Sequence, residues 1–145
     1  MDVNRNAQII VDLNAVIDAP LQTVWNLHTA VDQWPTWQKD ITEAWLTGPF
    51  AVGNSFAWQT HGLSIVSTLG EVDAMRRTVW GGPAHDIDGV HVWTFEETAA
   101  GVAVQTTESW DGAPIAADPE GMRAALTSSL TAWLAALKAT VESTD

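Results

Sequence analysis

The last quarter of the chain carries an apolar repeat that fits only one kind of element. Large apolar side chains recur at steps of four, four, three, four and four residues, at Met122, Leu126, Leu130, Trp133, Leu137 and Val141. This spacing places them along one face of an α-helix. Asp118 and Pro119, just before the repeat, are residue types that favour an N-cap and a first helical turn. The sequence therefore predicts a long amphipathic helix whose apolar face must be buried against another layer.

The segments before this helix are mostly typical of strands. Apolar and β-branched stretches, separated by turn residues, predict strands at 8–17, 41–47, 54–60, 63–72, 76–80, 89–97 and 102–110. Helical spacing behind Pro20 predicts a helix over 19–30, and a second short helix is expected over 31–38. Gly81-Gly82-Pro83 is expected to end the fifth strand and to begin a loop that reaches residue 89.

This order of elements restricts the fold. A mostly antiparallel sheet has an apolar face that needs cover, and only the final helix is large enough to provide it. We therefore predict an α+β helix-grip fold, in which a curved antiparallel sheet of about seven strands (β-α-α-β6-α) wraps around the long C-terminal helix with a cavity between them. No repeat or linker divides the 145 residues, so a single domain over 1–145, with its core at about 8–142, is expected.

Tryptophan is the unusual component of the composition. The chain has nine Trp, three Phe and no Tyr, and so many large flat rings in one small domain suggest a wide interior lined by them. The candidates for this lining are Trp37, Trp45, Trp58, Trp80, Trp93 and Trp110, of which strand alternation favours Trp58 and Trp93 most. Trp25 and Trp133 lie on helix stripes, where packing is the expected role. Met122 and Leu126 would form the helix wall at the cavity mouth, or simply belong to the core.

Charge and missing motifs exclude several classes of function. The formal net charge of −12 disfavours nucleic acid and anionic membranes as partners. The absence of Cys excludes thiolate chemistry and thiolate metal sites. No phosphate-binding glycine loop, dinucleotide fingerprint or Gly-x-Ser-x-Gly elbow is present. With a polar N-terminus and no apolar run of membrane-spanning length, we expect a cytoplasmic domain with no cofactor and no metal.

Several short segments, in this order, resemble the START/SRPBCC superfamily and its bacterial polyketide cyclase/dehydrase-like branch. They are Ile17-Asp18-Ala19-Pro20 with Val24-Trp25, Trp34-Pro35-x-Trp37, Val52-Gly53, His91-x-Trp93-x-Phe95 and Thr107-Glu108-Ser109-Trp110-x-Gly112. The resemblance covers about residues 8–142. It implies a hydrophobic cavity between sheet and helix, but no fixed catalytic residue, because members of the superfamily place their polar groups differently.

The last two predicted strands bring a histidine and a carboxylate to one face. Strand alternation places His91 and Trp93 on the same face as Glu108, and because this face carries the rings we assign it to the cavity. With a four-residue loop His91 lies directly opposite Glu108, whereas with a two-residue loop Glu108 faces Trp93. A buried His–Glu pair can transfer protons, as aldol cyclisation and dehydration require. The alternatives are a structural hydrogen bond, or a contact that fixes a polar end of the ligand.

The remaining histidines carry weaker signals. His61 is expected to point outward or into a turn with Gly62, and His28 to lie at the surface or in helix packing. His85, Asp86 and Asp88 have metal-binding chemistry, but a solvated loop at the cavity entrance is favoured over a metal site.

Two functions compete at this stage, and oligomeric state is not predicted. The first is an enzyme that cyclises or dehydrates a polyketide-like or aromatic substrate, with His91 and Glu108 as catalytic residues. The second is a non-catalytic carrier or sensor of a hydrophobic metabolite. A third reading, a regulatory domain that binds a protein partner, would be favoured if Trp side chains filled the cavity.

Overall fold

The computed structural model describes residues 1–143 and has the predicted order of elements with one addition. The elements are β1 (Ile9–Ile17), α1 (Leu21–Thr29), the 3-10 turn η1 (Val31–Gln33), α2 (Trp34–Trp37), β2 (Ile41–Leu46), β3 (Ser55–Thr60), β4 (Leu63–Asp73), β5 (Arg77–Ala84), β6 (Ile87–Thr98), β7 (Gly101–Asp111), α3 (Ala113–Ala117) and α4 (Pro119–Glu142). The short helix α3 is the addition that the sequence did not predict.

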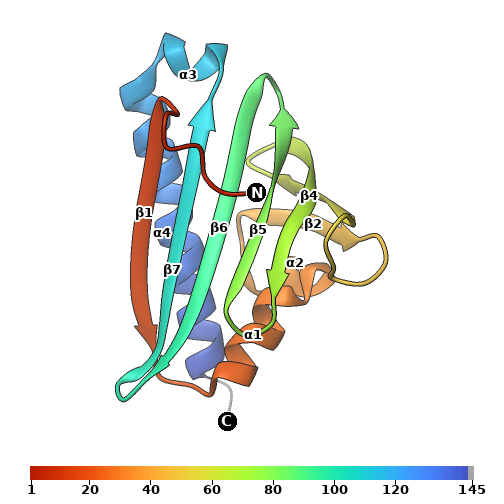
Figure 1. Cartoon of the computed structure of the whole chain (residues 1–145), viewed down its shortest axis with the longest axis vertical. Coiled ribbons are helices and arrows are strands. Elements are labelled where there is room, and N and C mark those ends of the chain that lie inside the picture. Colours follow the sequence, from red (N-terminus) through yellow and green to blue (C-terminus); the bar gives the residue numbers. More distant parts are fainter. Residues whose placement is uncertain (144–145) are drawn as a thin grey trace.

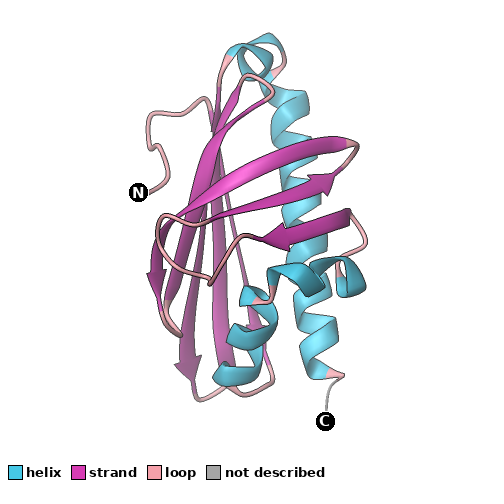
Figure 2. Ribbon diagram, turned by 90° about the vertical axis from the view of Figure 1, so that its right-hand side faces the viewer, coloured by secondary structure: helices cyan, strands magenta, loops and turns pink. Residues whose placement is uncertain are grey.

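The seven strands form one antiparallel sheet in the order β1-β7-β6-β5-β4-β3-β2 (Figure 1). The register of β4 against β5 shifts between Leu69 and Glu71, and such a bulge bends a strand and increases its twist. The sheet consequently curves, and its shorter strands cross the direction of the long ones on the side where α4 lies (Figure 2). The predicted helix-grip fold is confirmed.

Helix α4 covers the inner face of this sheet as its apolar repeat predicted. Its N-cap is Asp118, whose Oδ1 accepts a hydrogen bond from the backbone N–H of Gly121 at 3.1 Å. The buried residues of the helix are Leu126, Leu130, Trp133, Leu134, Leu137 and Val141. Leu134 is an addition to the predicted stripe. By length and composition α4 could cross a membrane, but here its apolar face packs on the sheet, as a core helix does.

Helix α4 also protects the edge strand β1. The guanidinium of Arg123 donates to the carbonyl oxygen of Ile10 at 3.0 Å, and Nζ of Lys138 donates to the carbonyl oxygen of Val16 at 2.8 Å. Exposed strand edges invite pairing with other chains, and covering their polar groups with charged side chains reduces this risk.

The buried side chains form two main clusters that follow each other along α4. The larger one contains most of the rings, including Trp34, Trp93 and Trp133, and the smaller one joins Ile9 and Ile115 to the first half of α4. This half of the helix packs on β1, whereas the strands beyond β1 leave room for a cavity beside it.

The prediction of a loop over residues 81–89 is wrong. Strand β5 continues through Gly81-Gly82-Pro83, and a two-residue turn, His85-Asp86, leads directly into β6. Both turn residues have positive φ, 54° and 65°, as the tight turns that suit β-hairpins require. Beyond Gly81 no pairing of β5 with β4 continues in the described chain, so Pro83 lies where the strand has one neighbour and its missing N–H is tolerated.

The N-terminal segment, residues 1–7, covers part of the outer face of the sheet, which the sequence did not predict. Val3 is buried against Val79 and Val92, and the backbone N–H of Asn4 donates to Oγ of Ser109 at 3.0 Å. Figure 1 shows this segment crossing in front of the central strands. The outer face is thereby partly covered, although nothing in the periodicity of the strands required it.

A pair of valine truncations tests this docked segment. Val3 is 6% exposed and Val52 is 63% exposed. We expect Val3→Ala to lower the free energy of unfolding by about 1–2 kcal/mol, because buried methyl groups are lost. Val52→Ala is the matched control and should change it by less than about 0.5 kcal/mol. Equal midpoints for the two variants in urea unfolding would mean that the segment is not docked.

Candidate functional site

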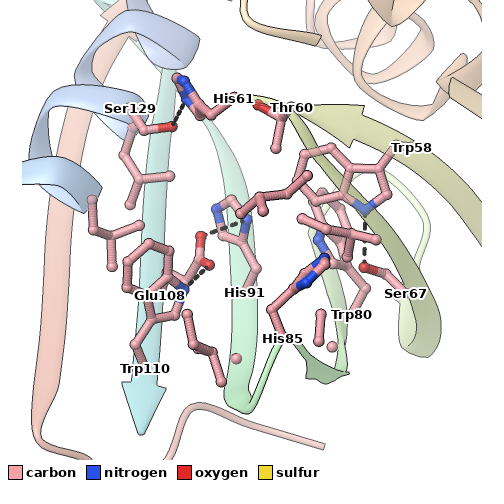
Figure 3. A pocket seen from close by; sticks show the side chains of 18 of the residues that line it. Trp58, Thr60, His61, Ser67, Trp80, His85, His91, Glu108, Trp110 and Ser129 are labelled. Carbon is pink, nitrogen blue, oxygen red and sulfur yellow. Dashed lines mark hydrogen bonds and ion pairs between the residues drawn. The ribbon is translucent and has the colours of Figure 1, made fainter. Parts of the chain in front are cut away.

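A cavity of about 340 Å³ lies between the sheet and α4 (Figure 3). Strands β3 to β7 supply one side of it and the first half of α4 supplies the other, and most of its wall is apolar. A volume near 300 Å³ is at the small end of the range for protein sites that enclose an organic ligand. The cavity is not filled by Trp side chains, which removes the observation that would have favoured the partner-binding reading.

Most of the predicted site residues border this cavity. Trp58, Trp80 and Trp110 lie on the sheet side, together with His91 and Glu108. Met122 and Leu126 lie on the helix side. Inward-facing positions recur at every second residue of a strand, which is why the strand pattern could place these rings.

Three of the predicted lining tryptophans are not on the cavity wall. Trp45 is 50% exposed on the outward side of β2. Trp93 does face inward, but it is fully buried in the larger core cluster beneath the cavity. Trp37, in α2, packs against the same cluster. Alternation along a strand identifies which face a residue lies on, but it does not distinguish packed core from cavity wall on that face.

Other lining residues were missed by the sequence reasoning. Trp133 was assigned to packing but also borders the cavity, because α4 faces both the core and the cavity along one stripe. His61 and His85 occupy the tips of the β3–β4 and β5–β6 hairpins, where they border the cavity. Nε2 of His61 lies 3.3 Å from Oγ of Ser129 on α4. Gly62 was a sequence signal for the turn at His61, and a loop at the cavity entrance was expected for His85, but no sequence signal indicated that His61 approaches α4.

The pair His91–Glu108 is the polar centre of the wall. The β6–β7 register pairs His91 directly with Glu108, which is the pairing expected for a four-residue loop, although the strands continue to Thr98 and Gly101 and leave a two-residue turn between them. Nδ1 of His91 lies 3.1 Å from Oε1 of Glu108, and Nε2 lies 2.7 Å from Oγ1 of Thr106. The indole N–H of Trp110 donates to Oε2 of Glu108 at 2.6 Å. Each nitrogen and each oxygen of the pair therefore has a protein partner. Figure 3 shows the contacts of Glu108 with His91 and Trp110.

Burial changes the titration of both groups in opposite directions. It lowers the pKa of His91 to about 3, and the nearby His28 contributes a smaller lowering. It raises the pKa of Glu108 to about 7, against the hydrogen bond from Trp110, which lowers it. Loss of hydration penalises the charged form of each group. Near neutral pH the pair consists of a neutral imidazole and a carboxyl group that can readily gain or lose a proton.

The two members of the pair differ in access to the cavity. The side chain of His91 is 4% exposed and that of Glu108 is 16% exposed, so the carboxyl group is the member that a bound molecule would touch. Thr106 can donate to or accept from Nε2, so the imidazole can carry its proton on either nitrogen. The imidazole is thus suited to orient Glu108 and to exchange a proton with it.

A second buried histidine lies outside the cavity wall. His28, on α1, is 1% exposed, and its Nε2 lies 2.8 Å from Oγ1 of Thr78. Its ring stacks on Trp80 with a centroid distance of 5.6 Å, and burial lowers its pKa to about 3. Of the two expectations for this residue, helix packing is the one that the structure shows.

Metal-binding geometry is not found in the described part of the chain. Residues 1–143 contain no group of three or more His, Asp or Glu side chains that could hold an ion. His85 instead lies with Nε2 2.9 Å from the carbonyl oxygen of Ser64. The residues that line the cavity include no Lys or Arg, and Glu108 is the one acid among them.

Comparisons with known proteins agree with this geometry. The chain superposes on a hypothetical protein from Helicobacter pylori with a TM-score of 0.84 and 18% identity, over 94% of this chain and 90% of the other. A START superfamily protein from Mycobacterium smegmatis superposes with a TM-score of 0.77 and 10% identity, over 94% of this chain and 99% of the other. The di-domain ARO/CYC protein StfQ of the steffimycin biosynthetic pathway superposes with a TM-score of 0.76 and 14% identity, over 94% of this chain and 52% of StfQ.

The sequence comparisons complete this picture. No match was found among curated protein sequences. The family model described as polyketide cyclase / dehydrase and lipid transport matches residues 8–142, the same span over which the START/SRPBCC resemblance was recognised. With nearly the whole chain matched and the helix-grip fold in place, the protein belongs to the polyketide cyclase / dehydrase and lipid transport family.

Proposed function

We propose that the protein encloses a small, ring-containing apolar molecule and catalyses its cyclisation or dehydration, with Glu108 as the group that moves protons. The observation that carries this proposal is a carboxyl group with a raised pKa, hydrogen bonded to a buried imidazole, on the wall of an otherwise apolar cavity. Titratable groups perturbed by burial in a cavity are candidates for catalysis. The family match and the aromatase/cyclase StfQ support the choice of reaction.

The chemistry requires one base that can also return a proton. As a carboxylate, Glu108 removes a proton from a carbon next to a carbonyl group, which leaves an enolate. The enolate carbon attacks a second carbonyl carbon, and the resulting alkoxide takes the proton back from Glu108. Loss of a further C–H proton and of the hydroxyl group as water then gives the double bond. A pKa near the working pH suits this alternation, and the cavity would hold the reacting carbons together.

The second candidate is a carrier or sensor that binds a similar molecule without transforming it. One observation favours it, namely that Thr106 and Trp110 already satisfy the hydrogen bonds of the His91–Glu108 pair. A fully satisfied polar pair is stable in a core without any substrate. Turnover and binding must therefore be measured on the same variants.

The first prediction concerns proton abstraction. 2-Tetralone is a bicyclic ketone with acidic hydrogens between its ring and its carbonyl group. We expect the protein to accelerate the exchange of these hydrogens in D₂O, followed by proton NMR, and we expect Glu108→Gln to reduce this acceleration by about 100-fold or more. The dissociation constant for 2-tetralone should change by less than about threefold, because Gln has the same shape.

The outcomes separate the two candidate functions. Glu96→Gln, an exposed carboxyl on the outer face of β6, is the matched control and should exchange like the unchanged protein. If 2-tetralone binds but exchanges no faster than in buffer, the carrier reading replaces the enzyme reading. If it does not bind at all, and other ring compounds do not either, both readings fail.

The second prediction concerns the pH profile. The exchange rate should rise with pH as Glu108 becomes ionised, with a midpoint near its pKa of about 7 and a plateau at higher pH. Trp110→Phe removes the indole N–H that donates to Oε2 and favours the carboxylate, so the midpoint of the profile should move upward. A midpoint that stays in place or moves downward would contradict the role of Trp110 in holding Glu108 ionised.

The third prediction concerns stability and follows from the same pKa. In the unfolded chain Glu108 titrates near its ordinary value of 4.5, whereas in the fold it titrates near 7. The unfolded state therefore releases the proton first, and the contribution of this group to stability falls as pH rises from about 4.5 to 7. We expect Glu108→Gln to raise the free energy of unfolding above pH 7 by on the order of 3 kcal/mol relative to its effect at pH 4. Urea unfolding at pH 4 and pH 8 measures this difference, and an effect of Glu108→Gln that is the same at both pH values would exclude it.

A further inference from the structure

Behind the carboxyl group of the cavity wall, a buried threonine completes a line of three polar side chains. Thr106 lies on β7, is 0% exposed and does not line the cavity itself. Its Oγ1 lies 2.7 Å from Nε2 of His91, whose Nδ1 lies 3.1 Å from Oε1 of Glu108. The hydroxyl group, the imidazole and the carboxyl group therefore form one chain of hydrogen bonds that runs from the packed core to the cavity.

The surroundings of Thr106 decide in which direction its hydrogen bond runs. A hydroxyl group can donate or accept, so its distance to Nε2 leaves the direction open. Among the described residues, Nε2 of His91 is the only hydrogen-bond partner of this hydroxyl group. Its neighbours across the strands are Trp93 and Leu13, whose side chains offer no acceptor. A buried hydroxyl hydrogen without an acceptor costs free energy, so the hydroxyl group of Thr106 donates to Nε2.

The direction of this bond determines where the imidazole carries its own hydrogen. A ring nitrogen that accepts a hydrogen bond has no hydrogen, and burial keeps the imidazole neutral because it lowers the pKa of His91 to about 3. The single ring hydrogen must therefore lie on Nδ1. Nδ1–H then donates to Oε1 of Glu108, while the indole N–H of Trp110 donates to Oε2. Both oxygens receive a hydrogen bond, which favours the ionised form of the carboxyl group.

The opposite arrangement is less favourable for the same reason. In that arrangement Glu108 is protonated and donates to Nδ1, while the ring hydrogen lies on Nε2 and points to Thr106. The hydroxyl hydrogen of Thr106 then has no acceptor among the described residues. The threonine thus favours the arrangement in which the imidazole is the donor and Glu108 is the acceptor.

The other titratable groups near the pair do not override this arrangement. From α1, His28 faces the same core, and burial lowers its pKa to about 3, so it is neutral near neutral pH. His61 and His85 lie at the hairpin tips, at the rim of the cavity. The inward-facing residues of β1 are apolar, and α4 lines the cavity without an acidic or basic residue. With no Lys or Arg in the described wall, the donors to Glu108 are the imidazole and the indole of Trp110.

We propose that Thr106 is a positioning residue that fixes the tautomer of His91 and thereby keeps Glu108 in the state that acts as a base. Of the two roles open to the imidazole, orientation of Glu108 is the one that this hydroxyl group favours over proton exchange. A proton that Glu108 takes from a bound molecule then stays on the cavity side, because Nδ1 already carries a hydrogen, and it can return to the same molecule. This inference rests on the proposed function, because it names what holds the proposed base in its working state.

Nitrogen NMR of ¹⁵N-labelled protein tests the tautomer directly and needs no substrate. The protonated and unprotonated nitrogens of a neutral imidazole have well-separated ¹⁵N shifts, and the signals of His91 are identified by their loss in His91→Asn or, if that variant does not fold, in His91→Gln. At a pH well above the pKa of Glu108, which is about 7, we expect Nδ1 of His91 to carry the hydrogen and Nε2 to carry none. A hydrogen on Nε2 at this pH would overturn the proposal.

Two threonine-to-valine substitutions separate this role from plain packing. Thr106→Val removes the hydroxyl group and keeps nearly the same shape. Thr78→Val is the matched control, because Thr78 is also 0% exposed and its Oγ1 lies 2.8 Å from Nε2 of His28, which contacts no carboxyl group in the described chain.

The pH profile of hydrogen exchange in 2-tetralone is the second readout. Thr106→Val should move its midpoint upward by about half a pH unit or more, because the variant no longer disfavours the arrangement with a protonated Glu108. The same variant should show more hydrogen on Nε2 of His91 in the NMR measurement. Thr106→Ser keeps the hydroxyl group, and both it and Thr78→Val should leave the midpoint within about 0.2 units of the unchanged protein.

The outcomes distinguish this proposal from the proposed function. Thr106 is only a packing residue if folded Thr106→Val keeps both the midpoint and the tautomer, or if Thr78→Val moves the midpoint as far. If Thr106→Val does not fold, the tautomer of the unchanged protein decides. If the unchanged protein does not accelerate exchange in 2-tetralone, the proposed function fails, whereas the NMR measurement still decides whether Thr106 fixes the tautomer of His91.

Discussion

The separation between α4 and the sheet is the constraint on which the rest of the structure depends. The second half of α4 packs into the large ring cluster around Trp133, and its first half packs on β1 and Ile115 through Leu126 and Leu130. Strands β3 to β7 do not close on this first half of the helix, and the space left between them is the cavity. The cavity is the consequence of this geometry, and every proposal about function depends on it.

The cavity gives a buried carboxyl group its chemical character. Water is largely excluded around Glu108, so its pKa rises, while Trp110 and His91 hold the group in one orientation. A group held in an environment that penalises its charged form costs stability, and proteins commonly accept this cost at functional sites. The same burial lowers the pKa of His91 and keeps the imidazole neutral. Burial in the cavity wall is thus the common cause of the acid–base properties of this pair and of its cost in folding stability.

The family and the fold leave the ligand undetermined, because the same architecture serves many unrelated molecules. What distinguishes this chain is the wall of its cavity. Rings from four strands lie on this wall, one carboxyl group is present, and no Lys or Arg is among the lining residues. These features together favour a compact and uncharged molecule, and they are properties of particular side chains rather than of the fold.

Local patterns were sufficient to predict most of the elements and the common face of His91 and Glu108, because helix and strand periodicities depend on neighbours in sequence. They could not predict the path of β5 through Gly81-Gly82-Pro83, since a proline is tolerated in a strand only where one neighbour is missing. Nor could they separate Trp58, on the cavity wall, from Trp93, in the packed core of the same face. The sequence by itself determined the order of the elements and, along β6 and β7, which residues face inward. Only the tertiary structure decided which of those residues border empty space, because that depends on how far apart the sheet and α4 are held.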